Sequence, residues 1–156
     1  RNPSLHDEPN MPYAQAVINE TLRMSSIASF GIFHKTLEDV KFKGFFIPKN
    51  TLIIGNQYAA NFDEATWGDP NVFRPERFLD SEGNLTREKE VMAFSYGKRS
   101  CIGERLARNQ LFLFSTNIFQ QFNSEFVGNE PSLEGIFGVV TKPQCFSLKF
   151  MKRNLM

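Results

Sequence analysis

The sequence predicts a mainly α-helical fold with small β-sheets. Two stretches, one ending near Met24 and one running from Glu104 to about Phe122, carry apolar side chains at helical spacing. Short runs rich in β-branched and aromatic residues lie between and after them, bounded by turn residues. The 17 phenylalanines and the 41% of hydrophobic residues need a sizeable core, and 156 residues suffice for one domain.

The first helix is predicted to begin at Asn10 and Pro12 and to run to about Met24. One face carries Ala14, Val17, Ile18 and Leu22. Glu20 and Arg23 fall roughly opposite that face. Periodicity alone therefore interprets these two as a solvated surface pair, worth a few tenths of a kcal/mol.

The middle of the chain is predicted to hold little helix. Residues 25–33 form an apolar link of mostly small residues, and residues 40–47 and 51–54 are predicted strands. Prolines in residues 61–79 favour irregular coil.

The last part of the chain is predicted to contain the second helix and a β-structure. A charged loop spans residues 80–90, and the helix from Glu104 is apolar almost all round, so we expect it to be buried. Residues 135–150 are predicted to form a turn and a strand pair, and residues 151–156 a frayed tail.

Composition excludes several classes of protein. The net charge of +1 gives no bias towards nucleic acid or acidic substrates. The chain has two cysteines, Cys101 and Cys145, and is not a cysteine-dense scaffold, so we expect no disulfide between them. No apolar run reaches the ~20 residues that a membrane-spanning helix needs.

Cys101 stands out because its surroundings favour a thiolate. Lys98 and Arg99 bring positive charge, and the predicted helix start just after Cys101 adds free N–H groups and the positive end of the helix dipole. A thiolate held in this way can ligate a metal or act as a nucleophile. The alternative is an inert buried cysteine at a helix start.

The spacing around this cysteine resembles the haem-binding signature of the cytochrome P-450 monooxygenases. The signature is Phe-x-x-Gly-x-Arg-x-Cys-x-Gly, and its fixed places are filled by Phe94, Gly97, Arg99, Cys101 and Gly103. The resemblance implies that Cys101 is the proximal thiolate ligand of a haem iron, an arrangement that favours O–O cleavage.

The same resemblance gives roles to the neighbours of Cys101. Arg99 would pair with a haem propionate, Gly97 and Gly103 would let the loop lie against the porphyrin, and Phe94 would shield the sulfur. His34, in a stretch that resembles animal microsomal members, would contact a propionate. The alternative for His34 is an ordinary structural histidine.

A second family signature changes the interpretation of the first helix. Glu20 and Arg23 fit Glu-x-x-Arg, and the later Pro-Glu-Arg-Phe segment supplies Arg77. The resemblance implies that these three residues form a buried charge triad, which fixes the chain around the cysteine loop and does no chemistry. Loss of one member would then leave charge buried and unpaired.

The resemblance covers nearly the whole chain in the right motif order. It implies that residues 1–156 are the C-terminal haem-ligand portion of a single cytochrome P-450 domain, and an incomplete one. The family's oxygen-activating Ala-Gly-x-(Asp/Glu)-Thr segment does not occur in it, and neither does a membrane anchor. We therefore expect no catalytic residue in this chain.

The implied function belongs to the full-length parent protein. It is a haem-dependent monooxygenase that inserts one oxygen atom of O2 into a lipophilic substrate: a steroid, terpenoid hormone, fatty acid or xenobiotic. Electrons would come from NADPH through a flavoprotein reductase, at the cytoplasmic face of the endoplasmic reticulum membrane. The alternatives are a haem-thiolate isomerase or dehydratase, against which the unaltered cysteine loop argues, and a non-catalytic truncated product.

Two surfaces are also implied. The family receives electrons on the cysteine side of the haem, where Lys98, Arg105 and Arg108 would form a reductase footprint; the alternative is a solvated helix face. The substrate wall would come from two segments that face the distal haem in the family. Its residues are Ile27, Ala28, Gly31, Ile32, Phe137, Gly138 and Val139. Ordinary core packing is the alternative for these apolar or small residues.

Overall fold

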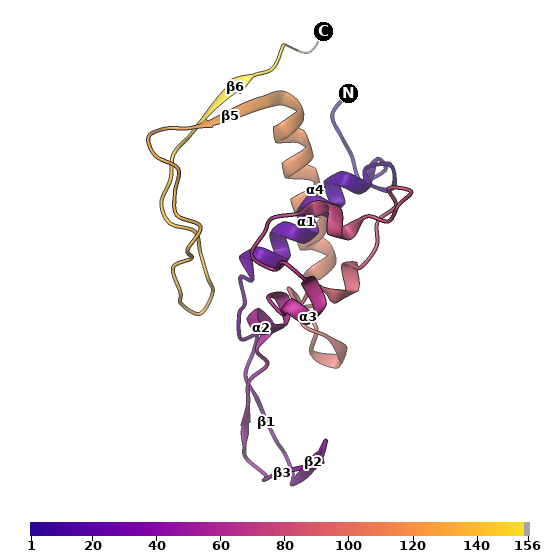
Figure 1. The fold of residues 1–156 in the computed structure, drawn as a ribbon, viewed down its shortest axis with the longest axis vertical. Helices are drawn as coiled ribbons and strands as arrows, with labels where there is room; N and C mark the ends of the chain where they lie inside the picture. Colours follow the sequence, from indigo (N-terminus) through magenta and orange to yellow (C-terminus); the bar gives the residue numbers. More distant parts are fainter. Residues whose placement is uncertain (155–156) are drawn as a thin grey trace.

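The computed structural model describes residues 1–154, and two crossing helices, α1 (Pro12–Ser25) and α4 (Glu104–Gln121), form its centre. Figure 1 shows the short helices α2 (Gln57–Asn61) and α3 (Glu64–Trp67) beside them, with the β-structure projecting away from the helices. Single 3-10 turns cover four further segments: Glu8–Asn10, Pro75–Phe78, Glu88–Glu90 and Gly97–Arg99.

The β-structure consists of three separate antiparallel pairs within residues 1–154. Its strands are β1 (His34–Lys35), β2 (Val40–Phe42), β3 (Phe45–Ile47), β4 (Leu52–Ile53), β5 (Phe122–Phe126) and β6 (Leu148–Lys152). β1 pairs with β4, β2 with β3 and β5 with β6, in the registers His34 to Ile53, Val40 to Ile47 and Phe122 to Lys152.

The predicted strand over residues 40–47 is a hairpin. Lys43 and Gly44 have φ angles of 48° and 85°, which is the left-handed conformation that a two-residue hairpin turn requires. The predicted strand over residues 51–54 is present as β4, and it pairs back to β1.

Helix α1 is present where the apolar spacing predicts it. Pro12 opens it, where a missing N–H costs nothing, and Ser26 ends it in a left-handed conformation with φ 38°. The surface-pair interpretation of Glu20 and Arg23 is wrong, because both side chains are fully buried. The reason is that α1 packs against the 3-10 turn Pro75–Phe78 on that side as well as against α4.

The core lies between α1 and residues 67–91. Its buried apolar members are Ala16, Leu22, Trp67, Phe78 and Val91. The irregular coil predicted for residues 61–79 is therefore only partly right, since it includes α3 and the 3-10 turn Pro75–Phe78. Side-chain caps start the short helices: Asn56 accepts from the Ala59 N–H at 3.0 Å and Asp63 from the Thr66 N–H at 2.9 Å.

The expected burial of α4 is wrong for most of its surface. Only Phe112 and Thr116 are buried, while Leu106, Phe114 and Phe119 are more than half exposed. Among the main elements of residues 1–154, α1 is the helix that packs against α4, and one neighbour covers only one stripe.

The predicted C-terminal strand pair is also different. β6 pairs with β5, which directly follows α4, and residues 135–142 contribute only an isolated bridge between Ile136 and Lys142. Met151 and Lys152 belong to β6, so the frayed tail does not begin at Met151. The predicted tail at residues 155–156 lies outside the described residues.

Candidate functional site

Cys101 lies at the end of a loop whose shape is set by its own backbone. Its N–H donates to the Phe94 carbonyl at 2.8 Å, and the Ser100 N–H donates to the Gly97 carbonyl at 3.1 Å. Its own carbonyl accepts from the Glu104 N–H, the first residue of α4, at 3.3 Å. The thiol is exposed in the described structure and forms no disulfide there, so residues 1–154 do not bury it as the alternative of an inert core cysteine expects.

Two glycines serve this loop in different ways. Gly97 has φ 74°, a conformation that a side chain would strain. Gly103 precedes α4, and a Cβ added there would lie 3.8 Å from the Cys101 sulfur. A residue larger than alanine at Gly103 would therefore crowd the approach to that sulfur.

The loop carries two cations without partners. Lys98 and Arg99 are exposed, and neither side chain makes a hydrogen bond or ion pair with another residue in the range 1–154. Both charges are therefore available to an acidic group that lies against the loop.

The donor set of this loop suits a metal that brings most of its own ligands. Within residues 1–154, no three histidine, cysteine or acidic side chains gather closely enough to hold an ion. One accessible sulfur, on a loop with an unpaired guanidinium and a glycine that carries no side chain, fits a flat metal cofactor with acidic substituents better than a bare cation. The residues present therefore fit haem.

A buried cluster of ions is centred on Glu20 of α1. Arg23 forms a two-bonded pair with this carboxylate, Nε to Oε2 at 2.8 Å and Nη2 to Oε1 at 2.9 Å. Arg77 donates from Nε to Oε1 at 3.1 Å, and the Arg74 N–H donates to the same oxygen at 2.9 Å. The structure thus brings together all three members of the sequence-predicted triad.

The remaining donors of the two arginines bind backbone carbonyls, and Arg77 also donates to the Asp69 carboxylate at 3.0 Å. Arg23 donates to Asn61 at 2.7 Å and to Pro70 at 2.8 Å. Arg77 donates to Trp67 at 2.8 Å and to Val72 at 3.0 Å. No buried side-chain polar atom within residues 1–154 lacks a partner, so the cluster avoids the usual penalty of buried charge.

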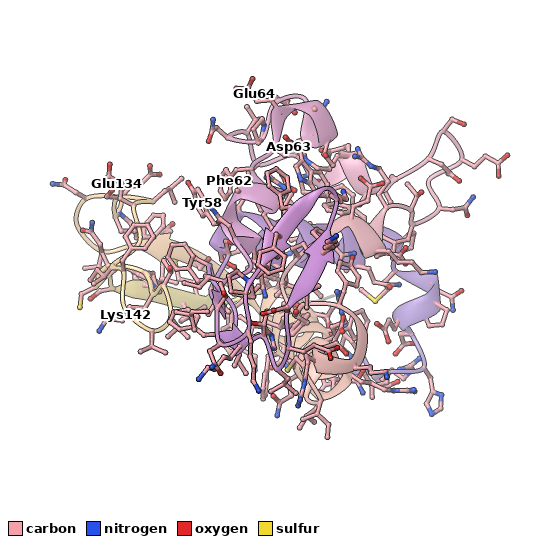
Figure 2. All side chains as sticks on the ribbon, turned by 90° about the horizontal axis from the view of Figure 1, so that it is seen from below. Tyr58, Phe62, Asp63, Glu64, Glu134 and Lys142 are labelled. Carbon is pink, nitrogen blue, oxygen red and sulfur yellow. The ribbon has the colours of Figure 1, made fainter. Side chains whose placement is uncertain are left out.

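Aromatic rings cover the same arginines. The guanidinium of Arg23 lies 5.3 Å from the Trp67 ring and 5.5 Å from the Phe62 ring, and that of Arg77 lies 6.0 Å from Trp67. Figure 2 shows Phe62 with Tyr58, whose rings stack 4.4 Å apart at α2. The cluster is thus enclosed by rings as well as by backbone.

Burial raises the pKa of Glu20, but its partners more than reverse that effect. Hydrogen bonds from Arg23, from the Arg74 N–H and from Arg77, together with the charge of Arg23, hold the pKa of this carboxyl below its ordinary value. Glu20 is therefore charged at neutral pH, as two guanidinium partners require.

Asn61 is a residue that sequence reasoning missed. Its side chain is fully buried, accepts from the Met92 N–H at 2.8 Å, and donates to the Met92 carbonyl at 3.3 Å and to Ser26 Oγ at 3.2 Å. It therefore ties the segment that leads into the cysteine loop to the end of α1. A lone asparagine carries no sequence signal for such a role.

A solvated helix face was the alternative to a reductase footprint for Lys98, Arg105 and Arg108. The contacts of Arg108 do not match a solvated side chain. Its guanidinium donates to Glu104 Oε1 at 2.9 Å and to Asn19 Oδ1 at 2.8 Å, and lies 5.3 Å from the Phe94 ring. Arg105, three residues earlier, is exposed and has no side-chain partner among residues 1–154. Of the three cations in the predicted footprint, Lys98 and Arg105 are therefore exposed and unpaired within residues 1–154, whereas Arg108 is held by side-chain contacts.

The two predicted wall segments lie together. The Thr141 N–H donates to the Ile27 carbonyl at 2.8 Å, and the hydroxyls of Ser29 and Thr141 are 3.3 Å apart. Figure 2 shows the loop between β5 and β6, with Glu134 and Lys142 labelled, as a lobe beside the helices. None of the wall residues named above is buried, so core packing within this part of the chain does not explain them.

Gly31 has a structural role within that wall. Its φ is 58°, and a Cβ added there would lie 2.6 Å from the Gln57 side chain. The absence of a side chain at Gly31 therefore makes room for Gln57 on α2.

His34 lies in β1, opposite Ile53 of β4, and its side chain is exposed. It makes no side-chain hydrogen bond with another residue in the described part of the chain. The structure thus gives it no structural partner there.

No helix of the described residues has the length and apolar character to cross a membrane.

The family model and the similar proteins found by comparison point to the same family. The family model described as "Cytochrome P450" matches residues 1–150. Farnesoate epoxidase of Bombyx mori is 45% identical over 156 residues, which are 99% of this chain and 31% of that protein. Cytochrome P450 2D4 of Rattus norvegicus is 41% identical over 150 residues, 95% of this chain and 30% of that protein. Cytochrome P450 1A1 of Rattus norvegicus is 47% identical over 123 residues, 78% of this chain and 24% of that protein. The chain thus spans less than a third of each relative.

Proposed function

Because this chain belongs to the cytochrome P450 family, we propose that it is the C-terminal haem-ligand portion of one P450 domain, with Cys101 as the axial thiolate. The observation that carries the proposal is the exposed sulfur of Cys101, held by the bond to the Phe94 carbonyl directly before α4. Bound haem would supply the oxygen-activating chemistry, which thiolate ligation favours.

The residues of this chain bind and orient in the proposed site. Arg99 would pair with a propionate, Gly97 and Gly103 would let the loop approach the ring, and Phe94 would shield the sulfur. His34 would contact a propionate. The exposure of Arg99 and His34, and their freedom from partners within residues 1–154, support both assignments.

The triad fixes the scaffold of this site. Glu20, Arg23 and Arg77 hold α1, the Trp67–Val72 segment and the Pro75–Phe78 turn in one arrangement, and Asn61 extends that arrangement to Met92. These residues do no chemistry. They keep the base of the cysteine loop in place.

We infer that the full-length protein is a haem-dependent monooxygenase acting on a lipophilic substrate such as a steroid, terpenoid, fatty acid or xenobiotic. The apolar, unburied wall segments around Ile27 and Val139 support that class, and the name of the Bombyx mori relative supports a terpenoid within it. An NADPH-dependent flavoprotein reductase supplies the electrons, at the cytoplasmic face of the endoplasmic reticulum membrane. This chain alone is inactive.

The ligand assignment is tested with Cys101→Ala in the full-length protein, and Cys145→Ala, also an exposed cysteine, is the matched control. Reduced wild-type protein with carbon monoxide should show the absorption band of thiolate ligation. We expect Cys101→Ala to abolish that band and Cys145→Ala to keep it. A band that survives in Cys101→Ala would disprove the assignment.

A further inference from the structure

Arg108 contacts three parts of the structure, one of them 89 residues away in the sequence. Its own helix provides Glu104, α1 provides Asn19 and the cysteine loop provides the ring of Phe94. Asn19 is almost fully buried and directly precedes Glu20 of the ion cluster. A single side chain therefore links the cluster to the loop.

The contact with Phe94 is the important one for Cys101. The carbonyl of Phe94 accepts the N–H of Cys101 at 2.8 Å, while its ring lies beneath the Arg108 guanidinium at 5.3 Å. A displaced Phe94 ring first turns about its χ1 and χ2 bonds, and the part of the displacement that these rotations do not absorb moves the backbone and its carbonyl. The contact that holds this ring therefore contributes to the position of the sulfur.

We propose that Arg108 is a positioning residue for Cys101, acting through Phe94, with Asn19 as its anchor on α1. The proposal rests on the proposed function of Cys101 as axial ligand. The planar fork of a guanidinium reaches Glu104 and Asn19 through different nitrogens while its face covers the ring. A lysine ammonium lacks that fork, so it cannot hold all three partners in the same geometry.

The same contacts indicate that Arg108, unlike Arg105, has little part in docking a reductase. The carboxylate of Glu104 offsets the Arg108 charge, and the guanidinium is largely covered, so it contributes little to long-range attraction of a protein partner. Arg105 keeps a free, exposed charge in the described structure. The reductase footprint therefore reduces to Lys98 and Arg105.

The test compares Arg108→Gln and Arg108→Lys with Arg105→Gln in the full-length protein. The protein is reduced chemically with dithionite, which bypasses the reductase surface, and the decay of the thiolate-type carbon monoxide band is followed. We expect both Arg108 variants to incorporate haem and to lose this band faster than Arg105→Gln. For Arg108→Gln the acceleration should be about tenfold, the ratio that corresponds to one charge-assisted hydrogen bond.

Asn19→Ala gives the second variant. It leaves the guanidinium over Phe94 but removes the anchor on α1. We therefore expect the carbon monoxide band to decay faster than in Arg105→Gln, but less fast than in Arg108→Gln. A redox titration adds an independent readout, because a displaced sulfur should also shift the haem reduction potential relative to Arg105→Gln.

Each outcome decides the proposal. Decay rates and potentials of both Arg108 variants equal to those of Arg105→Gln would overturn it, as would wild-type behaviour of Arg108→Lys. If Arg108→Gln fails to take up haem, Asn19→Ala decides: faster decay with full haem content supports the proposal, and a wild-type rate overturns it. Failure of the proposed function is distinguishable, since it appears as a thiolate band that survives Cys101→Ala.

Discussion

At the scale of single residues, the carboxylate of Glu20 is the centre of the buried ion cluster. It accepts from two guanidinium groups and from the Arg74 backbone, with no exposure to solvent. Its lowered pKa means that the folded state binds its proton more weakly than the unfolded chain does. The stability that Glu20 contributes is therefore present above the ordinary carboxyl pKa of about 4.3. It is lost as the pH falls through the lower, folded value.

We therefore predict two effects of Glu20→Gln in the full-length protein. At neutral pH it should reduce the free energy of unfolding by about 3 kcal/mol, because buried Arg23 loses its carboxylate partner and buried Arg77 keeps only Asp69. Below about pH 4.3 stability should fall less steeply with acid than in wild type. Urea unfolding at several pH values measures both effects.

Glu38→Gln is the control, since Glu38 is exposed and its side chain has no partner within residues 1–154. An unchanged slope in acid for Glu20→Gln would show that this carboxylate does not govern the acid response.

At the scale of elements, α2 connects regions that differ in proposed role. Asn61 binds Met92, ahead of the cysteine loop, and the Tyr58 N–H donates to the Ser29 carbonyl at 3.0 Å in the link after α1. That link bears Ile27 and is bonded in turn to Thr141. The proposed wall and the proposed ligand loop therefore share a five-residue helix as their common support.

The element-scale prediction concerns this wall. Val139 is fully exposed, so Val139→Phe adds bulk without a clash inside the described chain. In the full-length protein we expect it to keep the thiolate carbon monoxide band and to change the product distribution.

Leu133→Phe is the control, because Leu133 is equally exposed in the same loop but outside the proposed wall. Products that stay unchanged in Val139→Phe, with normal haem content, would remove Val139 from the substrate site.

The elements also show how far sequence reasoning reaches. α1 and α4 were predictable because each is longer than three turns and carries an apolar stripe, which periodicity detects. α2 and α3 were not, because helices of five and four residues depend on caps and on tertiary contacts. The positions of Asn61 and Arg108 could not be predicted either, since their partners lie 31 and 89 residues away.

For the ion cluster, motif order carried information that periodicity lacked. Helical spacing placed Glu20 and Arg23 on the solvent side, whereas the Pro-Glu-Arg-Phe segment pointed to a third partner. The burial of that side comes from the turn Pro75–Phe78, which no local pattern around α1 reports.

At the scale of the whole molecule, two of the exposed cations without an ion-pair partner in residues 1–154 lie at the cysteine loop and the start of α4. Lys98 is on the cysteine loop and Arg105 is in the first turns of α4, and both are exposed. If a reductase docks there, Lys98→Glu should slow its electron transfer, with a loss that shrinks as salt screens the interaction. Stopped-flow reduction at two ionic strengths measures this.

Lys41→Glu has the same change in net charge but lies on β2, in a different part of the structure, and should leave the rate unchanged. Equal rates for Lys98→Glu and wild type at low salt would remove the footprint.

The order of contacts along the chain has a consequence for synthesis of the protein. Glu20, Arg23, Asn61, Arg77 and Met92 all precede Cys101, so the ribosome releases them first. We expect the ion cluster and the Asn61 clamp to assemble before the thiol emerges, and α4 with Arg108 to close over the loop afterwards. Cys101 would then emerge next to a scaffold that has already folded. This order limits the time during which its thiol is part of an unfolded segment.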